Sequence, residues 1–393
     1  MRKQIEGSRA IAEAVAACKP DVICAYPISP QTHIVEALDD ITRKGELGNS
    51  EFINVESEFS AMSVAIGVSA AGSRVYTATA SQGLLFMVEP VFNASGLGLP
   101  IVMTVANRAI GAPINIWNDH SDAMSQRDSG WIQLYAQDNQ SAADLHVFAF
   151  RLAELVSLPV MVCMDGFVLT HAMEQIDVPE TAQAQEFLKP FDPRQVLDTE
   201  APVSIGAMVG PEAFTEVRYL AHQKQIEALN SIPTLADEFE AVFGRRAAGA
   251  DDVRGLLTHY RAADADTIVI ALGATIGTIE DTIDEMREAG DSIGLIGITA
   301  FRPFPFAALR DALSDAKRIV IVERALAAGV GGVVAADVRA ALTGLDPKIY
   351  TVIAGLGGRP ITRASLRDVF SAAATDSLDE LTFMDLNREM LPL

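Results

Sequence analysis

Short apolar runs alternate with amphipathic segments along the first 170 residues of the chain. Runs that are apolar throughout, rather than at every second residue, are typical of strands buried on both faces of a parallel sheet. The predicted strands are 22–28, 52–56, 74–80, 100–106 and 159–166, and the predicted helices are 6–18, 31–44, 58–71, 82–95 and 141–157. This alternation predicts an α/β fold built on a doubly wound parallel sheet.

A second alternation of the same kind begins near residue 267. Its predicted strands are 267–272, 293–299, 318–323 and 348–354, and its predicted helices are 275–288, 306–315, 331–343 and 363–374. Every interval between strands is long enough for a crossover helix, which predicts a second, smaller parallel sheet. Between the two alternations, an acidic, proline-bearing arm starts at about residue 172 and leads into a helical run over 213–244.

These patterns predict two domains. The first spans 1–245 and includes the connecting arm, the second spans 262–375, and 376–393 form a C-terminal tail. The stretch 107–138 interrupts the first alternation, because it is long, rich in polar side chains and carries both tryptophans. Long ordered loops in α/β domains are usually functional.

Charge and cysteine content narrow the class of protein. Thirty basic against 52 acidic residues give a formal net charge of −22, which argues against nucleic acid and anionic membranes as partners. No apolar run is long and uncharged enough to span a bilayer, and the N-terminus does not resemble a signal peptide. The three cysteines are scattered, so we expect no iron–sulfur cluster or structural zinc on this chain, and a reducing, cytoplasmic location.

Polar side chains follow three of the predicted strands. Ser29 stands between two prolines after the first strand, Glu56 and Glu58 stand at the junction between the second strand and the next helix, and Arg108 follows the fourth strand. The carboxyl ends of parallel strands meet at the edge where open α/β sheets bind ligands. Together these side chains predict a site for an anionic small molecule. The acid can accept a proton, the arginine can form two hydrogen bonds with a carboxylate, and the hydroxyl adds a further hydrogen bond.

Taken singly, each of these residues also fits a structural role. Ser29 can stand at the start of the following helix, and acids are favoured at helix N-termini by the dipole. Arg108 can instead form an ion pair with an acid nearby: Glu56, Asp119 or Asp122.

The remaining sequence carries no self-sufficient catalytic motif. Phosphate-binding P-loop, H-E-x-x-H and G-x-S-x-G patterns are absent, and the glycine-rich segment 354–360 is best interpreted as a tight turn. His120, in the long loop, is expected to line the site. The other histidines are predicted to be structural or on the surface: His33, His146, His171, His222 and His259.

Five stretches together resemble a known family. They are AYPISPQT (25–32), VESEFSAM (55–62), AGSRVYTATASQGL (71–84), LPIVMTVANRAIGAPINIWNDHSDAMSQRDSGWIQLYAQDNQ (99–140) and LPVMVCMDGFVLTH (158–171). The set is similar to the α subunit of 2-oxoacid:ferredoxin oxidoreductases, in particular the multi-subunit pyruvate synthase type. The similarity runs from the first helix to 355–360, which is nearly the whole chain.

The resemblance implies a fold and a set of partners. The first half would be the pyrimidine-type thiamine diphosphate domain, and the second half would be the transketolase C-terminal-like domain. A β subunit would hold the diphosphate and its Mg²⁺ through a G-D-G motif that this chain lacks. Ferredoxin-like γ and δ subunits would carry 4Fe-4S clusters, so the enzyme would be active only as a complex.

The resemblance also implies an activity, the oxidative decarboxylation of a 2-oxoacid such as pyruvate. Coenzyme A would take the acyl group, CO₂ would leave, and ferredoxin would receive the electrons. Glu58 would bond N1′ of the aminopyrimidine, Ile28 would contact the cofactor, Arg108 would pair with the substrate carboxylate and Ser29 would bond to that carboxylate or to the 2-oxo group. Possible lining residues are Glu56, Phe59, Asn107, Asn118 and His120, and no metal is expected on this chain.

Three positions depart from the pyruvate-type pattern. Ser29 stands where threonine is usual, and Phe59 and Val88 stand where histidine is frequent. These changes remove polarity or add apolar bulk, which leaves a bulky 2-oxoacid such as phenylglyoxylate, with NAD or ferredoxin as acceptor, as an alternative. A non-oxidative thiamine enzyme and a non-catalytic scaffold subunit are the alternatives of other classes.

Overall fold

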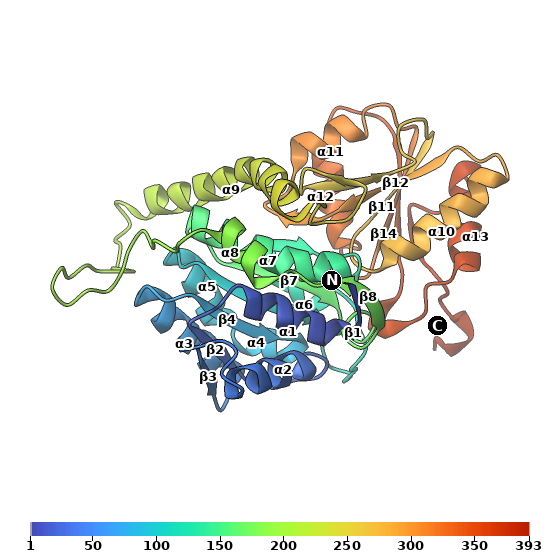
Figure 1. Cartoon of the computed structure of the whole chain (residues 1–393). Coiled ribbons are helices and arrows are strands. Elements are labelled where there is room, and N and C mark those ends of the chain that lie inside the picture. Colours follow the sequence, from blue (N-terminus) through green and yellow to red (C-terminus); the bar gives the residue numbers. More distant parts are fainter. Residues whose placement is uncertain (1, 393) are drawn as a thin grey trace.

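The computed structural model describes residues 2–392 of the chain. Positions 1 and 393, the outer ends of the expected first domain and of the expected tail, lie outside the described residues. The chain forms two seven-stranded sheets and a separate two-stranded ribbon, with helices packed around both sheets (Figure 1). The predicted α/β class is therefore confirmed.

The first sheet is parallel except at one edge. In spatial order its strands are β13 (Ala300–Arg302), β6 (Ile132–Tyr135), β7 (Val160–Asp165), β5 (Ile101–Asn107), β4 (Val75–Thr79), β2 (Val22–Ala25) and β3 (Glu51–Asn54). Only β13 runs antiparallel to its neighbour, β6. The parallel strands therefore bring their carboxyl ends, and the segments that follow them, to one edge of the sheet.

Helices cover both faces of this sheet because each presents an apolar stripe. The helices that enter one core are α1 (Gly7–Ala17), α2 (Thr32–Arg43) and α7 (Asn139–Val156), and those that enter the other are α3 (Glu58–Ala70), α4 (Ser81–Phe86) and α5 (Val88–Gly96). In α2 the buried residues Ile34, Val35, Leu38 and Ile41 follow the helical repeat. A sheet with helices on both faces explains why its strands are apolar throughout.

The second sheet is also mostly parallel. In spatial order its strands are β16 (Leu381–Phe383), β15 (Lys348–Ile353), β14 (Arg318–Glu323), β11 (Thr267–Ala271), β12 (Ile293–Ile298), β10 (Leu257–Tyr260) and β9 (Asp252–Val253). Its helices are α10 (Thr275–Glu288), α11 (Phe306–Ala312), α12 (Val333–Ala341) and α13 (Arg363–Ala374). Strands β9 and β10 lie before residue 262, where the second domain was predicted to begin. Strand β16 lies in the predicted C-terminal tail, 376–393, and pairs with β15.

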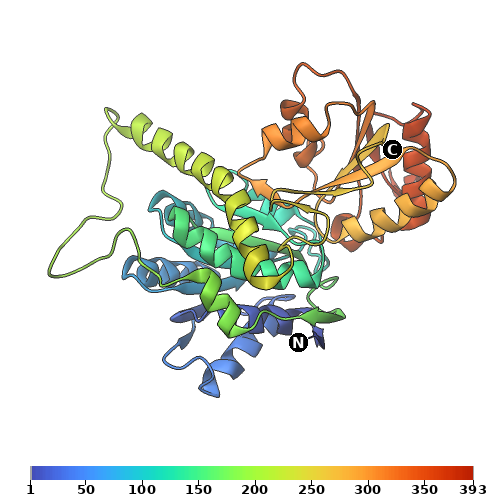
Figure 2. The same ribbon diagram turned by 45° about the horizontal axis from the view of Figure 1, so that its top comes forward.

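The two sheets are tied together by the chain itself. Strand β13 follows β12 of the second sheet but pairs with β6 of the first, and Tyr135 N donates to Thr299 O at 2.8 Å. One apolar core also runs from the first sheet into the second, with Met161 of β7 and Ile270 of β11 among its members. Figure 2 shows the C-terminal part of the chain, coloured orange to red, beside the N-terminal part. The stretch 107–138, which was predicted to be a loop, contains the strand β6 and the short helix α6 (Ser121–Ser125).

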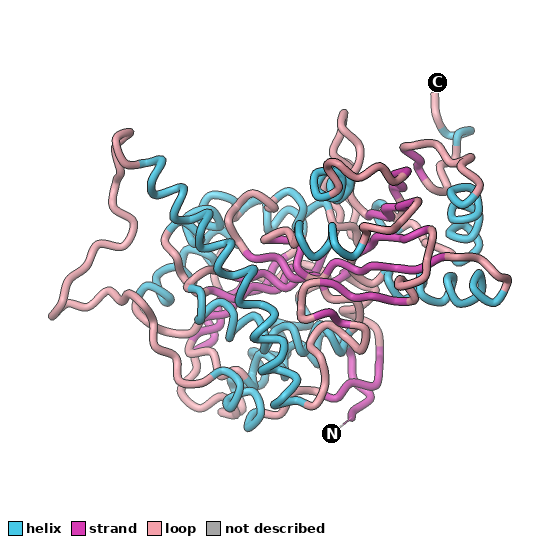
Figure 3. The backbone as a smooth tube through the Cα atoms, turned by 90° about the horizontal axis from the view of Figure 1, so that it is seen from above, coloured by secondary structure: helices cyan, strands magenta, loops and turns pink. Residues whose placement is uncertain are grey.

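An antiparallel ribbon and a long helix complete the chain. Strand β1 (Arg2–Glu6) pairs with β8 (Met173–Asp177) and directly precedes α1. After α8 (Thr181–Leu188), an extended segment projects from the body and returns as α9 (Phe214–Phe243) (Figure 3). Short 3₁₀ turns are η1 (Leu356–Gly358) and η2 (Arg388–Met390). Within residues 2–392, no helix has the length and apolarity needed to cross a membrane.

Glu280 on α10 gives a stability prediction. Burial, and then the charges of Asp251 and Asp138, raise the pKa of this half-buried carboxyl to about 7. The folded state therefore binds the proton more tightly than the unfolded state, and stability falls as pH rises from about 4.5 to about 7. We expect Glu280→Gln to raise the free energy of unfolding by about 1–2 kcal/mol at pH 8, after allowance for solvent screening.

At pH 4 the same variant should match the parent chain, because Glu280 is then protonated in both states. Urea unfolding at the two pH values measures the difference. Glu186→Gln, at an exposed position on α8, is the matched control and should show no such pH dependence. Equal stabilisation of the Glu280 variant at both pH values would contradict the assignment.

Candidate active site

Glu58 stands at the carboxyl edge of the first sheet, as the first residue of α3. Ser57 caps this helix by accepting a hydrogen bond from Ser60 N at 3.2 Å. The cap fixes the helix start and directs Glu58 inward, where the residue is only 7% exposed.

The carboxylate of Glu58 faces the start of α4. A Cβ atom on Gly83 would lie 2.6 Å from Glu58 Oε1 and 2.6 Å from Thr79 Oγ1, so only glycine leaves this approach open. No hydrogen bond to the Glu58 side chain occurs among residues 2–392, and the buried Thr79 Oγ1 is unpaired there as well. Buried polar groups normally have partners, so two unpaired oxygens side by side indicate a place for a donor from outside the chain.

Glu56 differs from Glu58 in each of these respects. Its side chain is exposed and accepts a hydrogen bond from Ser60 Oγ. This hydrogen bond lowers the pKa of the Glu56 carboxyl. Glu56 is thus an ionised surface acid at the helix start, which is the structural role that the sequence allowed for one of the two.

Arg108 follows β5 and is buried beside Ser29. Its Nη1 donates to Ser29 O at 2.8 Å, and its Nε donates to Asn115 O at 3.3 Å. Its Nη2 lies 3.4 Å from Gln82 Oε1, next to Gly83. These contacts connect Arg108 with Ser29 on one side and with the surroundings of Glu58 on the other.

The ion pair considered for Arg108 does not form within the described part of the chain. Of the three acids, only Asp122 contacts it, by accepting from its backbone N–H at 2.9 Å. Burial lowers the pKa of the guanidinium, and the charge of Asp122 opposes this change. A buried guanidinium that is paired only with neutral oxygens favours the binding of an anion.

Asp122 organises this edge of the sheet. Its carboxylate accepts from Ser81 N at 2.9 Å, Asn107 Nδ2 at 2.8 Å and Ala123 N at 2.7 Å, as well as from Arg108 N. Burial raises its pKa to about 6, and these hydrogen bonds act in the opposite direction. The sequence alone indicates Asp122 only as a possible ion-pair partner, because no local signal shows that a residue will join the ends of two strands.

The segment that carries Ser29 is fixed by its backbone. Gln31 is buried, its Nε2 donates to Tyr26 O at 2.9 Å and Ala78 O at 3.2 Å, and its backbone N–H donates to Ile28 O at 2.9 Å. Helix α2 starts at Thr32, and no side-chain hydrogen bond caps it. Ser29 therefore does not cap this helix, and the residue is exposed, with its backbone carbonyl bonded to Arg108.

Aromatic side chains lie exposed near the same edge. Phe59 is 37% exposed and Phe86 is 59% exposed, with ring centroids 6.3 Å apart. Exposed large apolar groups that lie together usually mark a binding surface.

Asn118 and His120, which were expected to line the site, are instead sealed between the two sheets. Both bond to Asp165 Oδ1 at 2.9 Å, and Arg324 Nη1 reaches the same oxygen at 3.0 Å. Burial alone would raise the pKa of Asp165, but the charges of His120 and Arg324 outweigh it and hold this pKa well below its usual range. Asn107 is also buried, and its Nδ2 donates a hydrogen bond to the Asp122 carboxylate. These three residues therefore position the site from within the protein and are not exposed on its surface.

The glycine-rich turn at 354–360 packs against the long loop. Asn115 Nδ2 donates to Gly357 O at 3.1 Å, and Gly357 N donates to Asp119 Oδ2 at 3.1 Å. Gly355, Gly357 and Gly358 have positive φ angles, which glycine adopts without strain. The prediction of a tight turn agrees with this geometry.

The edge as a whole fits the aminopyrimidine that the sequence resemblance implies. Glu58 offers a buried acceptor without a partner among residues 2–392, and its carboxylate lies directly against Gly83. Arg108 and the exposed Ser29 are neighbours at the same edge, and a guanidinium and a hydroxyl are groups that can hold a carboxylate. No diphosphate-binding motif accompanies these residues in the sequence.

Two family models match the chain. One is described as pyruvate flavodoxin/ferredoxin oxidoreductase, thiamine diphosphate-binding, and covers residues 13–238. The other is described as pyruvate:ferredoxin oxidoreductase core domain II and covers residues 265–366.

Individual relatives match over nearly the whole chain. The pyruvate synthase subunit PorA of Methanosarcina barkeri (strain Fusaro / DSM 804) is 43% identical over an alignment of 398 residues. The alignment covers 98% of this chain and 97% of the relative. The ketoisovalerate oxidoreductase subunit VorA of Pyrococcus horikoshii (strain ATCC 700860 / DSM 12428 / JCM 9974 / NBRC 100139 / OT-3) is 37% identical, with coverage of 95% and 93%.

Solved structures share the fold. The 2-oxoglutarate:ferredoxin oxidoreductase from Magnetococcus marinus has a TM-score of 0.72 at 19% identity and covers 95% of this chain. The chain spans 65% of that longer chain. An inactive split-gene transketolase tetramer has a TM-score of 0.55 at 13% identity, with coverage of 95% and 99%. The expected fold, a thiamine diphosphate-binding domain followed by a transketolase C-terminal-like domain, is confirmed.

Proposed function

The chain belongs to the pyruvate flavodoxin/ferredoxin oxidoreductase family, and from this premise we propose that it is the α subunit of a thiamine diphosphate-dependent pyruvate synthase complex. The reaction is the CoA-dependent oxidative decarboxylation of pyruvate to acetyl-CoA and CO₂, with electrons passed to ferredoxin. Pyruvate is preferred because the relative named as a pyruvate synthase subunit is 43% identical, against 37% for the ketoisovalerate oxidoreductase subunit.

One observation carries the proposal, the buried and unpaired carboxylate of Glu58 opposite Gly83. An acid without a partner at the ligand-binding edge of a parallel sheet suits the N1′ atom of an aminopyrimidine, which needs an acid close by. The exposed Glu56, two residues earlier, has no such environment.

In this proposal the residues of this chain orient the cofactor and the substrate and place charged groups beside them. Bound thiamine diphosphate supplies a carbon nucleophile for the 2-oxo carbon and accepts the electrons left when CO₂ departs. Glu58 holds a proton at N1′ of the aminopyrimidine, and Ile28, in the fixed segment after β2, contacts the ring. Arg108 binds the substrate carboxylate, and the Ser29 hydroxyl bonds to that carboxylate or to the 2-oxo oxygen.

The partner subunits complete the site. A β subunit binds the diphosphate and Mg²⁺, and γ and δ subunits carry 4Fe-4S clusters. The three cysteines of this chain are free and buried, and no cluster-binding spacing occurs in the sequence. Buried free thiols are compatible with a reducing cytoplasm.

The division into domains follows the same proposal. Residues 1–245 form the pyrimidine-type domain with its arm. The transketolase C-terminal-like domain, predicted as 262–375, also includes the flanking strands β9, β10 and β16 of the second sheet. The two matched segments, 13–238 and 265–366, support this division.

Gly83→Ala tests whether the space beside Glu58 receives the cofactor. The added methyl group would fall 2.6 Å from Glu58 Oε1, so the carboxylate must move. We expect an approximately 10-fold weaker thiamine diphosphate affinity of the assembled complex, since displacements of this size are costly at preorganised sites. Gly67→Ala on α3 is the control, because nothing lies within 4 Å of its added Cβ. Equal affinity in the two variants would contradict this placement.

The proposed function is tested with the complex assembled from its subunits. Reduction of ferredoxin is measured with a panel of 2-oxoacids in the presence of CoA, and we expect the highest kcat/KM for pyruvate. Preference for phenylglyoxylate would instead favour the bulky-substrate alternative suggested by Phe59. A complex without bound iron would favour a non-oxidative thiamine enzyme.

A further inference from the structure

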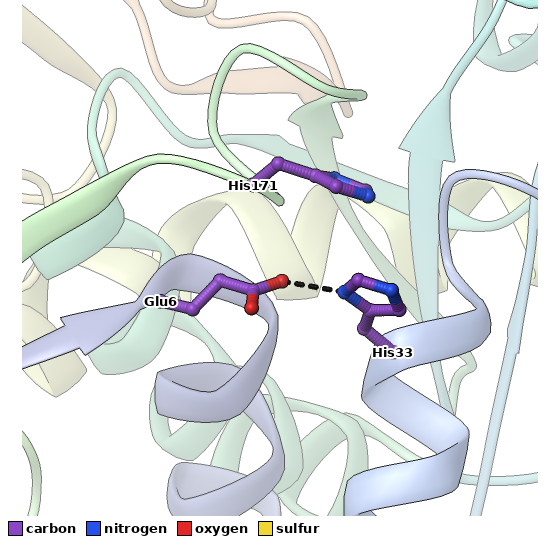
Figure 4. A group of neighbouring side chains, drawn as sticks. All are labelled: Glu6, His33 and His171. Atoms are coloured by element: carbon purple, nitrogen blue, oxygen red, sulfur yellow. Dashed lines mark hydrogen bonds and ion pairs between the residues drawn. The ribbon is translucent and has the colours of Figure 1, made fainter.

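Glu6, His33 and His171 form a compact cluster at the surface (Figure 4). His33 Nδ1 lies 2.7 Å from Glu6 Oε1, and the two imidazole rings lie 4.7 Å apart between centroids, tilted by 35°. One donor atom of each side chain lies within 4.8 Å of the other two. Both histidines are exposed and Glu6 is half-buried, so an ion can reach the cluster from solvent.

Backbone hydrogen bonds hold two of the three segments in a fixed relation. Glu6 pairs with Met173 in the ribbon of β1 and β8, and Gly7 N donates to Ala172 O at 3.0 Å. His171 immediately precedes this paired stretch. The site is therefore anchored by a sheet ladder on one side and by the first turn of α2, which carries His33, on the other.

The ring atoms of the histidines are oriented by their neighbours. Thr170 Oγ1 lies 2.7 Å from His171 Nδ1, which leaves Nε2 of that ring as the atom for a ligand bond. This arrangement, in which one ring nitrogen is held by a neighbour and the other binds metal, is usual for metal-binding histidines.

We propose that Glu6, His33 and His171 form a binding site for a divalent transition-metal ion of the Zn²⁺ class, with water as the remaining ligand. Two imidazole nitrogens and one carboxylate oxygen are ligands that Zn²⁺ accepts in tetrahedral sites, whereas Mg²⁺ and Ca²⁺ prefer oxygen alone. Ligand atoms around such an ion lie about 3.3 Å apart, so donors that are as much as 4.8 Å apart must draw together by up to about 1.5 Å. Rotation of exposed side chains allows this change.

A bound ion would join the N-terminal ribbon, the start of α2 and the loop after β7. His33 lies four residues beyond Ser29, so the ion would also fix the far end of the segment that carries the Ser29 hydroxyl. The sequence alone predicts both histidines to be structural or on the surface and predicts no metal on this chain. The site escapes a spacing search because its three ligands come from distant parts of the chain.

The experiment uses the untagged full chain, freed of metal by a chelator and titrated with Co²⁺. We expect one equivalent to bind with the visible absorption of four-coordinate Co²⁺, and Zn²⁺ to displace it. His33→Gln and His171→Gln should each weaken Co²⁺ binding at least about 100-fold, and Glu6→Gln about 10-fold. His222→Gln, at an exposed position on α9, should bind as the parent chain does.

Circular dichroism of the metal-free variants verifies that each one is folded, and Glu6→Gln provides the test if a histidine variant is not. Absence of the Co²⁺ absorption at equimolar metal would overturn the proposal. So would equal weakening of binding by His222→Gln and His171→Gln. None of these readouts involves turnover, so a negative result leaves the proposed function of the chain unaffected.

Discussion

Glu58→Gln in the assembled complex is expected to lower kcat by about 10²- to 10⁴-fold, with little change in the KM for the 2-oxoacid. Glutamine keeps the size of the side chain and its place opposite Gly83, but it cannot exchange a proton with N1′ of the aminopyrimidine. Because Glu58 has no hydrogen-bond partner among residues 2–392, the substitution breaks no internal bond. The loss should therefore appear in turnover, measured by ferredoxin reduction, and not in the melting temperature.

Glu56→Gln is the matched control for this variant. It lies two residues away at the same helix start, and its exposed carboxylate bonds only to Ser60 within the described chain. We expect its kcat to stay within about 3-fold of the parent value, as is usual for a surface change. If the two variants lost activity equally, or if neither did, the role of Glu58 would be wrong and a scaffold subunit would be the better interpretation.

Arg108→Ala is expected to raise the KM for the 2-oxoacid by about 100-fold, with a smaller effect on kcat. The guanidinium is buried and bonds only to neutral oxygens, those of Ser29, Asn115 and Gln82, so a substrate carboxylate would be its charged partner. Loss of one member of a buried charge pair typically costs about 2–5 kcal/mol of binding free energy. Arg108→Lys should be intermediate, because an ammonium group cannot grip both carboxylate oxygens in one plane.

The KM for CoA reports whether the effect is local. It should change little in the Arg108 variants, since the proposed contact is with the 2-oxoacid alone. Arg363→Ala, at an exposed arginine of α13 that pairs with Glu285, is the control and should leave both KM values unchanged. A parallel rise of both KM values in Arg108→Ala would indicate general damage to the fold and would count against a carboxylate site.

Much of the candidate site follows from strand patterns alone. Ser29, Glu58 and Arg108 each follow a predicted strand, and a parallel sheet necessarily carries such positions to one edge. The structure adds what holds them there: the backbone contacts of Gln31 beside Ser29, and the carboxylate of Asp122 beneath Arg108. Neither contact has a sequence signature, because each depends on the path of a loop.

The burial of His120 and Asn118 shows the same limit. A long polar loop suggested solvent-facing groups, but both side chains bond to Asp165 in the contact between the sheets. Polar residues in such a loop are satisfied by one another as readily as by a ligand. Only the fold of residues 107–120 against the second sheet decides between the two.

The sequence by itself determined the α/β class, nearly all the helices and the strands that are buried on both faces, because those features depend on hydrophobic periodicity over neighbouring residues. The tertiary structure alone decided the pairing of β1 with β8, the crossing of β13 to the first sheet and the cluster of Glu6, His33 and His171. These features join segments that are far apart in the chain. Short edge strands and surface clusters gain their stability from such distant partners, and local sequence does not encode where the partners will lie.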